Sequence, residues 1–180
     1  GVSGRLSAVD YPSSFAAARS AVGDGDDGRV LVLPFSSYRA PAWNQGRKVL
    51  DPVGRCLKPD FGASDELIVS GVTIRGEDPR GDDVRRALAA GSAEARRQAL
   101  LDLGIGWVVV DRSAPGESVQ LGGDEVLSGD DVRVLRLGLA ARDPLPVGWW
   151  VVMALAWAAF LAPGTVGALR LRGKGSLRDT

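Results

Sequence analysis

The residue types best suited to binding a ligand are concentrated between Leu33 and Pro52, in the segment LPFSSYRAPAWNQGRKVLDP. Aromatic rings line small-molecule sites, and Asn and Asp side chains form hydrogen bonds with hydroxyl groups. An arginine guanidinium holds a phosphate with two parallel N–H bonds. The segment therefore predicts a site for a sugar or a phosphate. Its candidate ligand-binding residues are Tyr38, Arg39, Trp43, Asn44, Arg47 and Asp51.

A second interpretation of the same segment needs no ligand. Tyr38 and Trp43 would pin an irregular loop to the domain, and the charged side chains would form ion pairs with one another. Residue types alone do not separate these two interpretations.

Catalytic chemistry has few candidates in this chain. The sequence has no histidine, which removes the commonest general base and the Ser-His and Cys-His nucleophile pairs. Asp65-Glu66 and Glu77-Asp78 are adjacent carboxylates, and neighbouring residues do not share a face. Cys56 is the single cysteine. We therefore expect no catalytic residue, no metal and no cofactor in this segment, and a self-contained hydrolase is the weakest hypothesis. Because the formal charge is zero, no nucleic-acid partner is expected either.

Hydrophobic periodicity predicts the elements that must position these residues. The expected fold class is α/β, a small mixed sheet with flanking helices, followed by one C-terminal transmembrane helix. At least partly parallel pairing is expected between residues 29–34 and 106–110, while residues 36–64 show no period. The predicted helices begin at Pro12, Asp78 and Ser92, and the predicted strands cover 29–35, 66–72, 105–111, 118–121 and 131–137.

Residues 147–169, VGWWVVMALAWAAFLAPGTVGAL, carry no charge and are followed by a basic segment. An uncharged run of this length predicts a membrane span. By the positive-inside rule, the basic tail at 170–180 would be cytoplasmic and residues 1–146 an extracytoplasmic α/β domain at the plasma membrane. The alternatives are a helix docked on a soluble domain and a tail anchor with the domain in the cytoplasm. Since the first residues contain no export signal, we expect this chain to be the C-terminal piece of a longer, polytopic protein.

Several motifs resemble one group of membrane proteins. They are VLVLPFSSYR, WNQGRKVLDP, SGxxxxGEDPR, LLDLGIGWVVVD and the terminal apolar run with its basic tail. Together they resemble the C-terminal exported portion of actinobacterial multi-spanning glycosyltransferases of the GT-C class, which includes arabinofuranosyltransferase-like enzymes, and the ending of YfhO-type membrane proteins. The resemblance implies polyprenyl-phosphate sugars as substrates of the whole protein. The catalytic acid of that class lies in an early exported loop, so no catalytic residue is carried over.

These observations predict an accessory extracytoplasmic domain of a membrane glycosyltransferase of the cell envelope. The domain would contribute to binding a glycan acceptor or a lipid-linked sugar and would not itself be catalytic. Its partners would be the lipid bilayer and the remainder of the polytopic protein. The alternative is a non-catalytic scaffold or interaction domain of a membrane protein complex.

Overall fold

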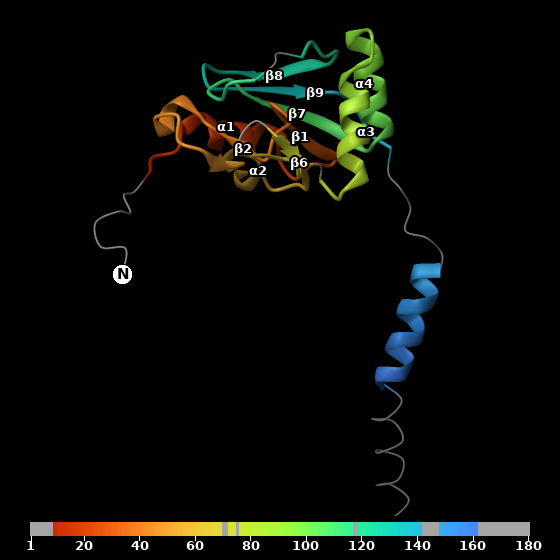
Figure 1. The fold of residues 1–180 in the computed structure, drawn as a ribbon. Helices are drawn as coiled ribbons and strands as arrows, with labels where there is room; N and C mark the ends of the chain where they lie inside the picture. The colour runs from red at the N-terminus through yellow and green to blue at the C-terminus, as the bar shows by residue number, and fades with distance from the viewer. Residues whose placement is uncertain (1–8, 70–71, 75, 117–118, 142–147, 162–180) are drawn as a thin grey trace, which may run out of the picture. The chain divides into compact units, whose positions relative to one another are not determined.

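The computed structural model describes residues 9–69, 72–74, 76–116, 119–141 and 148–161. The chain forms two compact units, Gly1–Arg142 and Asp143–Thr180, each of which is considered by itself. The first unit is the α/β domain that the hydrophobic periodicity predicts, and the second contains one described helix (Figure 1).

The first unit is built on a five-stranded mixed sheet with the order β4-β1-β7-β9-β8. β1 is parallel to both β4 and β7, whereas β9 is antiparallel to β7 and to β8. This confirms the predicted parallel pairing, in which Val32 lies opposite Val109. The strands are β1 (Arg29–Leu33), β4 (Phe61–Gly62), β7 (Ile105–Asp111), β8 (Asp124–Ser128) and β9 (Val132–Arg136).

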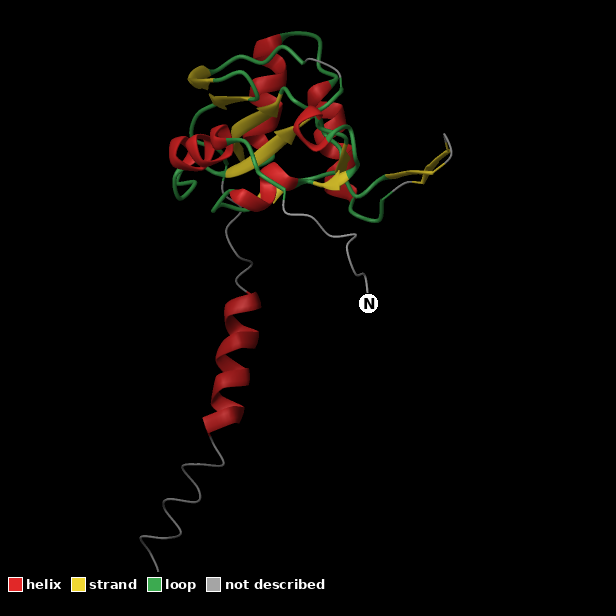
Figure 2. Cartoon of the chain, turned by 90° about the vertical axis from the view of Figure 1, so that its left-hand side faces the viewer, coloured by secondary structure: helices red, strands yellow, loops and turns green. Residues whose placement is uncertain are grey.

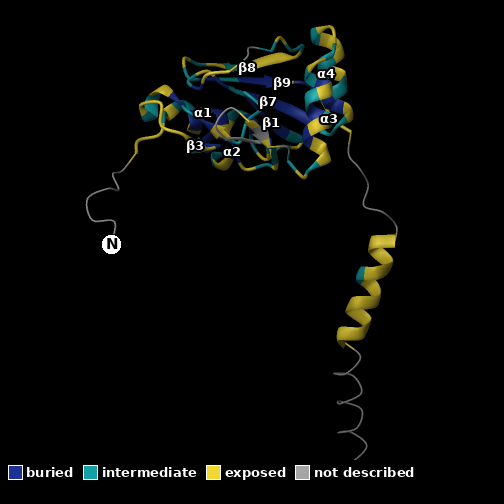
Figure 3. Ribbon diagram, viewed as in Figure 1, coloured by how far each residue is buried: buried dark blue, intermediate teal, exposed yellow. Residues whose placement is uncertain are grey.

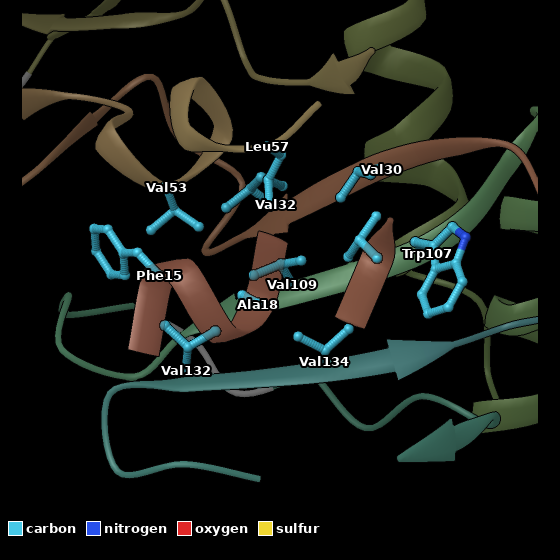
Figure 4. Close-up of a cluster of buried hydrophobic side chains, with 11 residues drawn as sticks. Phe15, Ala18, Val30, Val32, Val53, Leu57, Trp107, Val109, Val132 and Val134 are labelled. Carbon is cyan, nitrogen blue, oxygen red and sulfur yellow. The ribbon is translucent and has the colours of Figure 1, made fainter. Parts of the chain in front are cut away.

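Alternation along the central strands divides the core into two layers. Val30 and Val32 point to one face, where helices α1 (Ser13–Val22) and α2 (Pro52–Cys56) pack on them (Figure 4). Leu31 and Leu33 point to the other face, against α3 (Pro79–Leu88) and α4 (Ala93–Asp102). A strand that is covered on both faces needs apolar residues at every position, which explains the unbroken run in β1.

The capping residues of α3 and α4 predict where these two helices begin, and the structure confirms both starts. The Asp78 carboxylate accepts a hydrogen bond from the Arg80 N–H at 3.0 Å, with Pro79 in the first turn of α3. Ser92 Oγ accepts one from the Ala95 N–H at 3.1 Å, at the start of α4. These side chains satisfy backbone donors that have no partner within the helix, which fixes where each helix begins.

The Ser92 cap leads to a stability prediction. Ser92→Ala is expected to lower the free energy of unfolding by about 1 kcal/mol, because a backbone N–H of the first turn of α4 loses its acceptor. Urea denaturation of the full chain measures this. The matched control is Ser20→Ala, whose hydroxyl is bonded to the Ala16 carbonyl within α1 and caps nothing. Equal stability of the Ser92 variant and the wild type would contradict the capping role.

Short elements were predicted less well. Residues 36–64 contain β2 (Tyr38–Arg39), the 3-10 helix η1 (Ala42–Asn44), β3 (Val49–Leu50), α2 and β4. Elements of two to five residues are too short to establish a period. The helix α2 lies close to β4, since a Cβ atom at Gly54 would clash with the Phe61 ring. This packing is a tertiary contact that periodicity does not report.

Two strand predictions differ from the structure. The strand predicted at 66–72 corresponds to a separate hairpin, in which β5 (Leu67–Val69) pairs only with β6 (Val72–Ile74) among the described residues. Figure 2 shows it as two thin strands that extend from the domain. The strand predicted at 118–121 is wrong, because residues 119–121 are irregular and the sheet is completed by β8 instead. The polar β8 is an edge strand, which does not need the apolar pattern used to find buried strands.

The second unit is described over residues 148–161, which form a helix whose side chains are nearly all exposed (Figure 3). Within the described parts of the chain, no helix is both long and apolar enough to cross a membrane. The predicted span at 147–169 is described only in part, and residues 162–169 and the basic tail at 170–180 lie outside the described residues.

Candidate functional site

The carboxyl ends of β1 and β4 lie side by side at one edge of the sheet, because the two strands are parallel neighbours. The chain leaving β1 leads to α2 on one face of the sheet, and the chain leaving β4 leads to α3 on the other. Where neighbouring connections diverge to opposite faces, a crevice opens beyond the carboxyl ends of the strands, and ligands of α/β proteins bind there.

A crevice of about 510 Å³ is present at this edge. The chain that follows β1 contributes one wall, and the residues after β4 contribute another. This volume is within the range that holds a small molecule. The residues that line it are Pro34, Phe35, Ser36, Tyr38, Arg39, Ala40, Lys48, Ser64, Glu66 and Pro115.

Arg39 forms a buried ion pair with Asp51 beside the crevice. The Arg39 Nη1–H donates to Asp51 Oδ1 at 2.9 Å, and the two residues are only 4% and 2% exposed. Arg39 Nη2 donates to the Pro34 carbonyl at 3.0 Å, which ties the β2–β3 hairpin to the end of β1. Asp51 Oδ1 also accepts from the Gly54 N–H and caps α2. The pair therefore holds together β1, the hairpin and α2.

Burial favours the uncharged form of both partners, so it shifts the pKa of Asp51 and that of Arg39 in opposite directions. Burial raises the pKa of Asp51, and the positive charge of Arg39 opposes this rise. Burial likewise lowers the pKa of Arg39, against the charges of Asp51 and Asp111. Asp111, at the end of β7, is 1% exposed and accepts hydrogen bonds from the N–H and hydroxyl of Ser113. One cation and two carboxylates are thus buried at the carboxyl edge of the three parallel strands.

Tyr38 and Lys48 present their side chains to solvent at the mouth of the crevice. Tyr38 is 49% exposed, and Lys48 is exposed as well. Among the described residues, no hydrogen bond or ion pair to the Lys48 ammonium is found. An aromatic ring and an exposed ammonium at one opening suit a hydroxylated ligand that carries negative charge.

Trp43, Asn44 and Arg47 do not line the crevice. The Trp43 ring packs on the Phe15 ring edge to face, with centroids 6.0 Å apart, and also against the Tyr11 ring. The Asn44 side-chain amide donates to the Arg47 carbonyl at 3.2 Å and closes a local turn. Of the six predicted residues, the structure thus brings Tyr38 and Arg39 to the crevice and Asp51 beneath them, and it places the other three elsewhere.

Three further residues of the site come from segments that the sequence did not connect with it. Ser64 and Glu66 follow β4, and Arg85 is on α3. Arg85 Nη2 donates to Ser64 Oγ at 2.8 Å and forms an ion pair with Glu66 Oε2, also at 2.8 Å. The signal that could have found Ser64 and Glu66 is their position just after β4, a strand of two residues that periodicity does not detect.

Metal ligands do not converge at this edge in the described part of the chain. Over those residues, the structure contains no group of three or more His, Cys, Asp or Glu side chains that could hold an ion.

Comparison with known proteins gives two structural similarities. No protein-family model and no curated protein sequence matches the chain. The cryo-EM structure of the arabinofuranosyltransferase AftD from Mycobacteria is 18% identical over 75% of this chain, with a TM-score of 0.43. A second AftD structure, of a mutant, is 17% identical over 74% of this chain, with a TM-score of 0.46. The chain spans 13% of the length of each.

Proposed function

We propose that this chain is an accessory extracytoplasmic domain of a polytopic membrane glycosyltransferase of the cell envelope. Its crevice contributes to binding a glycan acceptor or a lipid-linked sugar, and the catalytic groups belong to another part of the protein. The resemblance of the sequence motifs suggests the class of membrane glycosyltransferases. The crevice at the carboxyl ends of β1 and β4 is the observation that supports a role in ligand binding.

The chemistry of the crevice supports a sugar ligand. Tyr38 offers a ring for the apolar face of a sugar, and Ser36 and Ser64 supply hydroxyl groups along the walls. Lys48 supplies an ammonium for a phosphate or another anionic group. Asp51 and Asp111, the carboxylates buried at this edge, do not line the crevice, so neither is placed for acid–base work on a ligand there.

The membrane location is supported by residues 147–169. The helix at 148–161 has Trp149 and Trp150 at its start and exposed apolar side chains along its length. Soluble domains seldom leave so much apolar surface in water, whereas a bilayer covers it. We infer that the full run from 147 to 169 spans the plasma membrane and that the basic tail at 170–180 is cytoplasmic.

Binding measurements on the full chain in detergent test the ligand role. Isothermal titration with envelope oligosaccharides and with a polyprenyl-phosphate sugar is expected to give saturable binding. Lys48→Ala is expected to weaken it by about 10- to 100-fold if the ligand is anionic, because a charge-assisted hydrogen bond is lost. Tyr38→Ala should also weaken it. The matched control is Lys58→Ala, an exposed lysine outside the crevice that pairs with Asp24.

Two outcomes would reject the ligand role. One is the absence of binding by any sugar in the panel, and the other is binding that is weakened as much by Lys58→Ala as by Lys48→Ala. Either result would favour the scaffold function. One observation already fits a scaffold, since Val72 and Ile74 expose apolar side chains on the β5–β6 hairpin.

A further inference from the structure

Most basic side chains of the described domain already have acceptors. Carboxylates hold Arg39, Lys58, Arg80, Arg85, Arg86, Arg97, Arg133 and Arg136. Backbone carbonyls hold Arg29, Arg96 and Arg112. Surface cations that pair with carboxylates contribute little to attracting a partner, because their charge is largely neutralised locally, whereas the arginines bonded to backbone carbonyls keep their charge but have part of their hydrogen-bonding capacity occupied.

Three of the remaining cations lie within one short stretch. Arg47, Lys48 and Arg55 are exposed, and no hydrogen bond or ion pair of their side chains is found among the described residues. Arg47 and Lys48 precede β3, and Arg55 lies in the last turn of α2. The acidic residue between them, Asp51, is buried and held by Arg39. Arg55 interacts electrostatically with the buried Asp51, which already pairs with Arg39, so the stretch still presents net positive charge.

Exposed apolar groups accompany these cations. Tyr38 on β2 lies directly opposite Leu50 on β3, and these side chains are 49% and 43% exposed. Directly opposed residues of an antiparallel pair share a face, so the tyrosine ring and the leucine form one apolar spot beside Lys48. A surface that combines unbalanced cations with exposed apolar side chains is suited to the interface of an anionic membrane.

We propose that the exposed residues Tyr38, Arg47, Lys48, Leu50 and Arg55 of the segment 38–55, called here the β2–β3 surface, dock together on an anionic lipid bilayer. Lipid explains the whole surface, because anionic headgroups attract the three cations while the interface accepts the ring of Tyr38 and the side chain of Leu50. A soluble acidic polymer would use the cations and leave Leu50 in water. Three cations give only weak attraction, which is sufficient for a domain that the proposed span at 147–169 keeps near the membrane.

Hydrogen exchange on the full chain with lipid nanodiscs tests docking. The amides of residues 44–56 are expected to exchange more slowly with discs that contain anionic phosphatidylserine than with neutral phosphatidylcholine discs. The double variant Arg47→Gln/Arg55→Gln should reduce the docked-to-free ratio by about 30-fold, about fivefold for each cation. Neither residue lines the crevice, so the test is independent of glycan binding. The matched control, Arg80→Gln/Arg86→Gln, removes two exposed cations from α3 and should change nothing.

Each result has a defined meaning. Equal exchange on neutral and anionic discs overturns docking, as does protection that the control variant removes equally well. Protection by dextran sulfate on neutral discs, without protection by anionic lipid, replaces the membrane by an acidic polymer. Association with anionic discs alone supports docking while rejecting the membrane anchor, and association with neither type of disc rejects both.

Discussion

Replacing Arg39 by alanine is expected to lower the free energy of unfolding by about 3–5 kcal/mol, because the Asp51 carboxylate then stays buried without a cation. Asp111 is buried in the same region and also acts on the Arg39 charge. The variant further loses the hydrogen bond from Arg39 to the Pro34 carbonyl. Urea denaturation of the full chain in a mild detergent, followed by tryptophan fluorescence, measures the difference.

Two variants make the explanation specific. Arg39→Met combined with Asp51→Leu removes both charges and should recover much of the loss, since a buried ion pair is not by itself strongly stabilising. Arg86→Ala removes an exposed arginine that pairs with Asp83 on α3, and it should have little effect. If the double variant is no more stable than Arg39→Ala, the uncompensated charge is not the cause.

Leu31→Ala should lower the free energy of unfolding by about 2–5 kcal/mol. Leu31 lies in the central strand β1, its side chain is fully buried, and it packs in the layer between the sheet and helices α3 and α4. Truncation removes apolar contacts and leaves a cavity that the two neighbouring strands prevent from closing. The same denaturation measurement applies.

Leu139→Ala is the control for Leu31→Ala, because Leu139 is 73% exposed and makes no comparable core contact. It should leave the unfolding midpoint nearly unchanged. A Leu31 variant as stable as the Leu139 variant would mean that β1 is not at the centre of the cooperative core.

The sequence predicted the elements that bury the core and missed those that shape the crevice. β1 and β7 are nearly continuous apolar runs, which predict buried strands. α3 and α4 begin at capping residues, which predict the first turns of the helices. β4 has two residues and is a strand only because it pairs with β1. Such pairing is a property of the folded chain, which explains why residues 36–64 showed no period.

The candidate site likewise has residues that the sequence predicts and residues that only the folded structure brings together. The residue types in Leu33–Pro52 predict ligand contacts for Tyr38, Arg39 and Asp51, which lie at or beside the crevice, but they do not show that Arg39 and Asp51 are buried and paired with each other. Lys48 lies within the same segment but is not among the predicted residues, because only the folded chain shows that it lines the crevice. Ser64 and Glu66 reach the site through β4, and no sequence pattern links them to Tyr38.

The pairing of β1 with β7 also has a kinetic consequence. Val32 lies opposite Val109, so the most apolar strand of the sheet has no partner on that side until the chain beyond Val109 has been made. At synthesis rates of 5–20 residues per second, this delay is roughly 4–15 s. During that time an unpaired apolar strand is a target for aggregation. A chaperone or a membrane surface that covers β1 during this interval is therefore expected to reduce aggregation of the nascent domain.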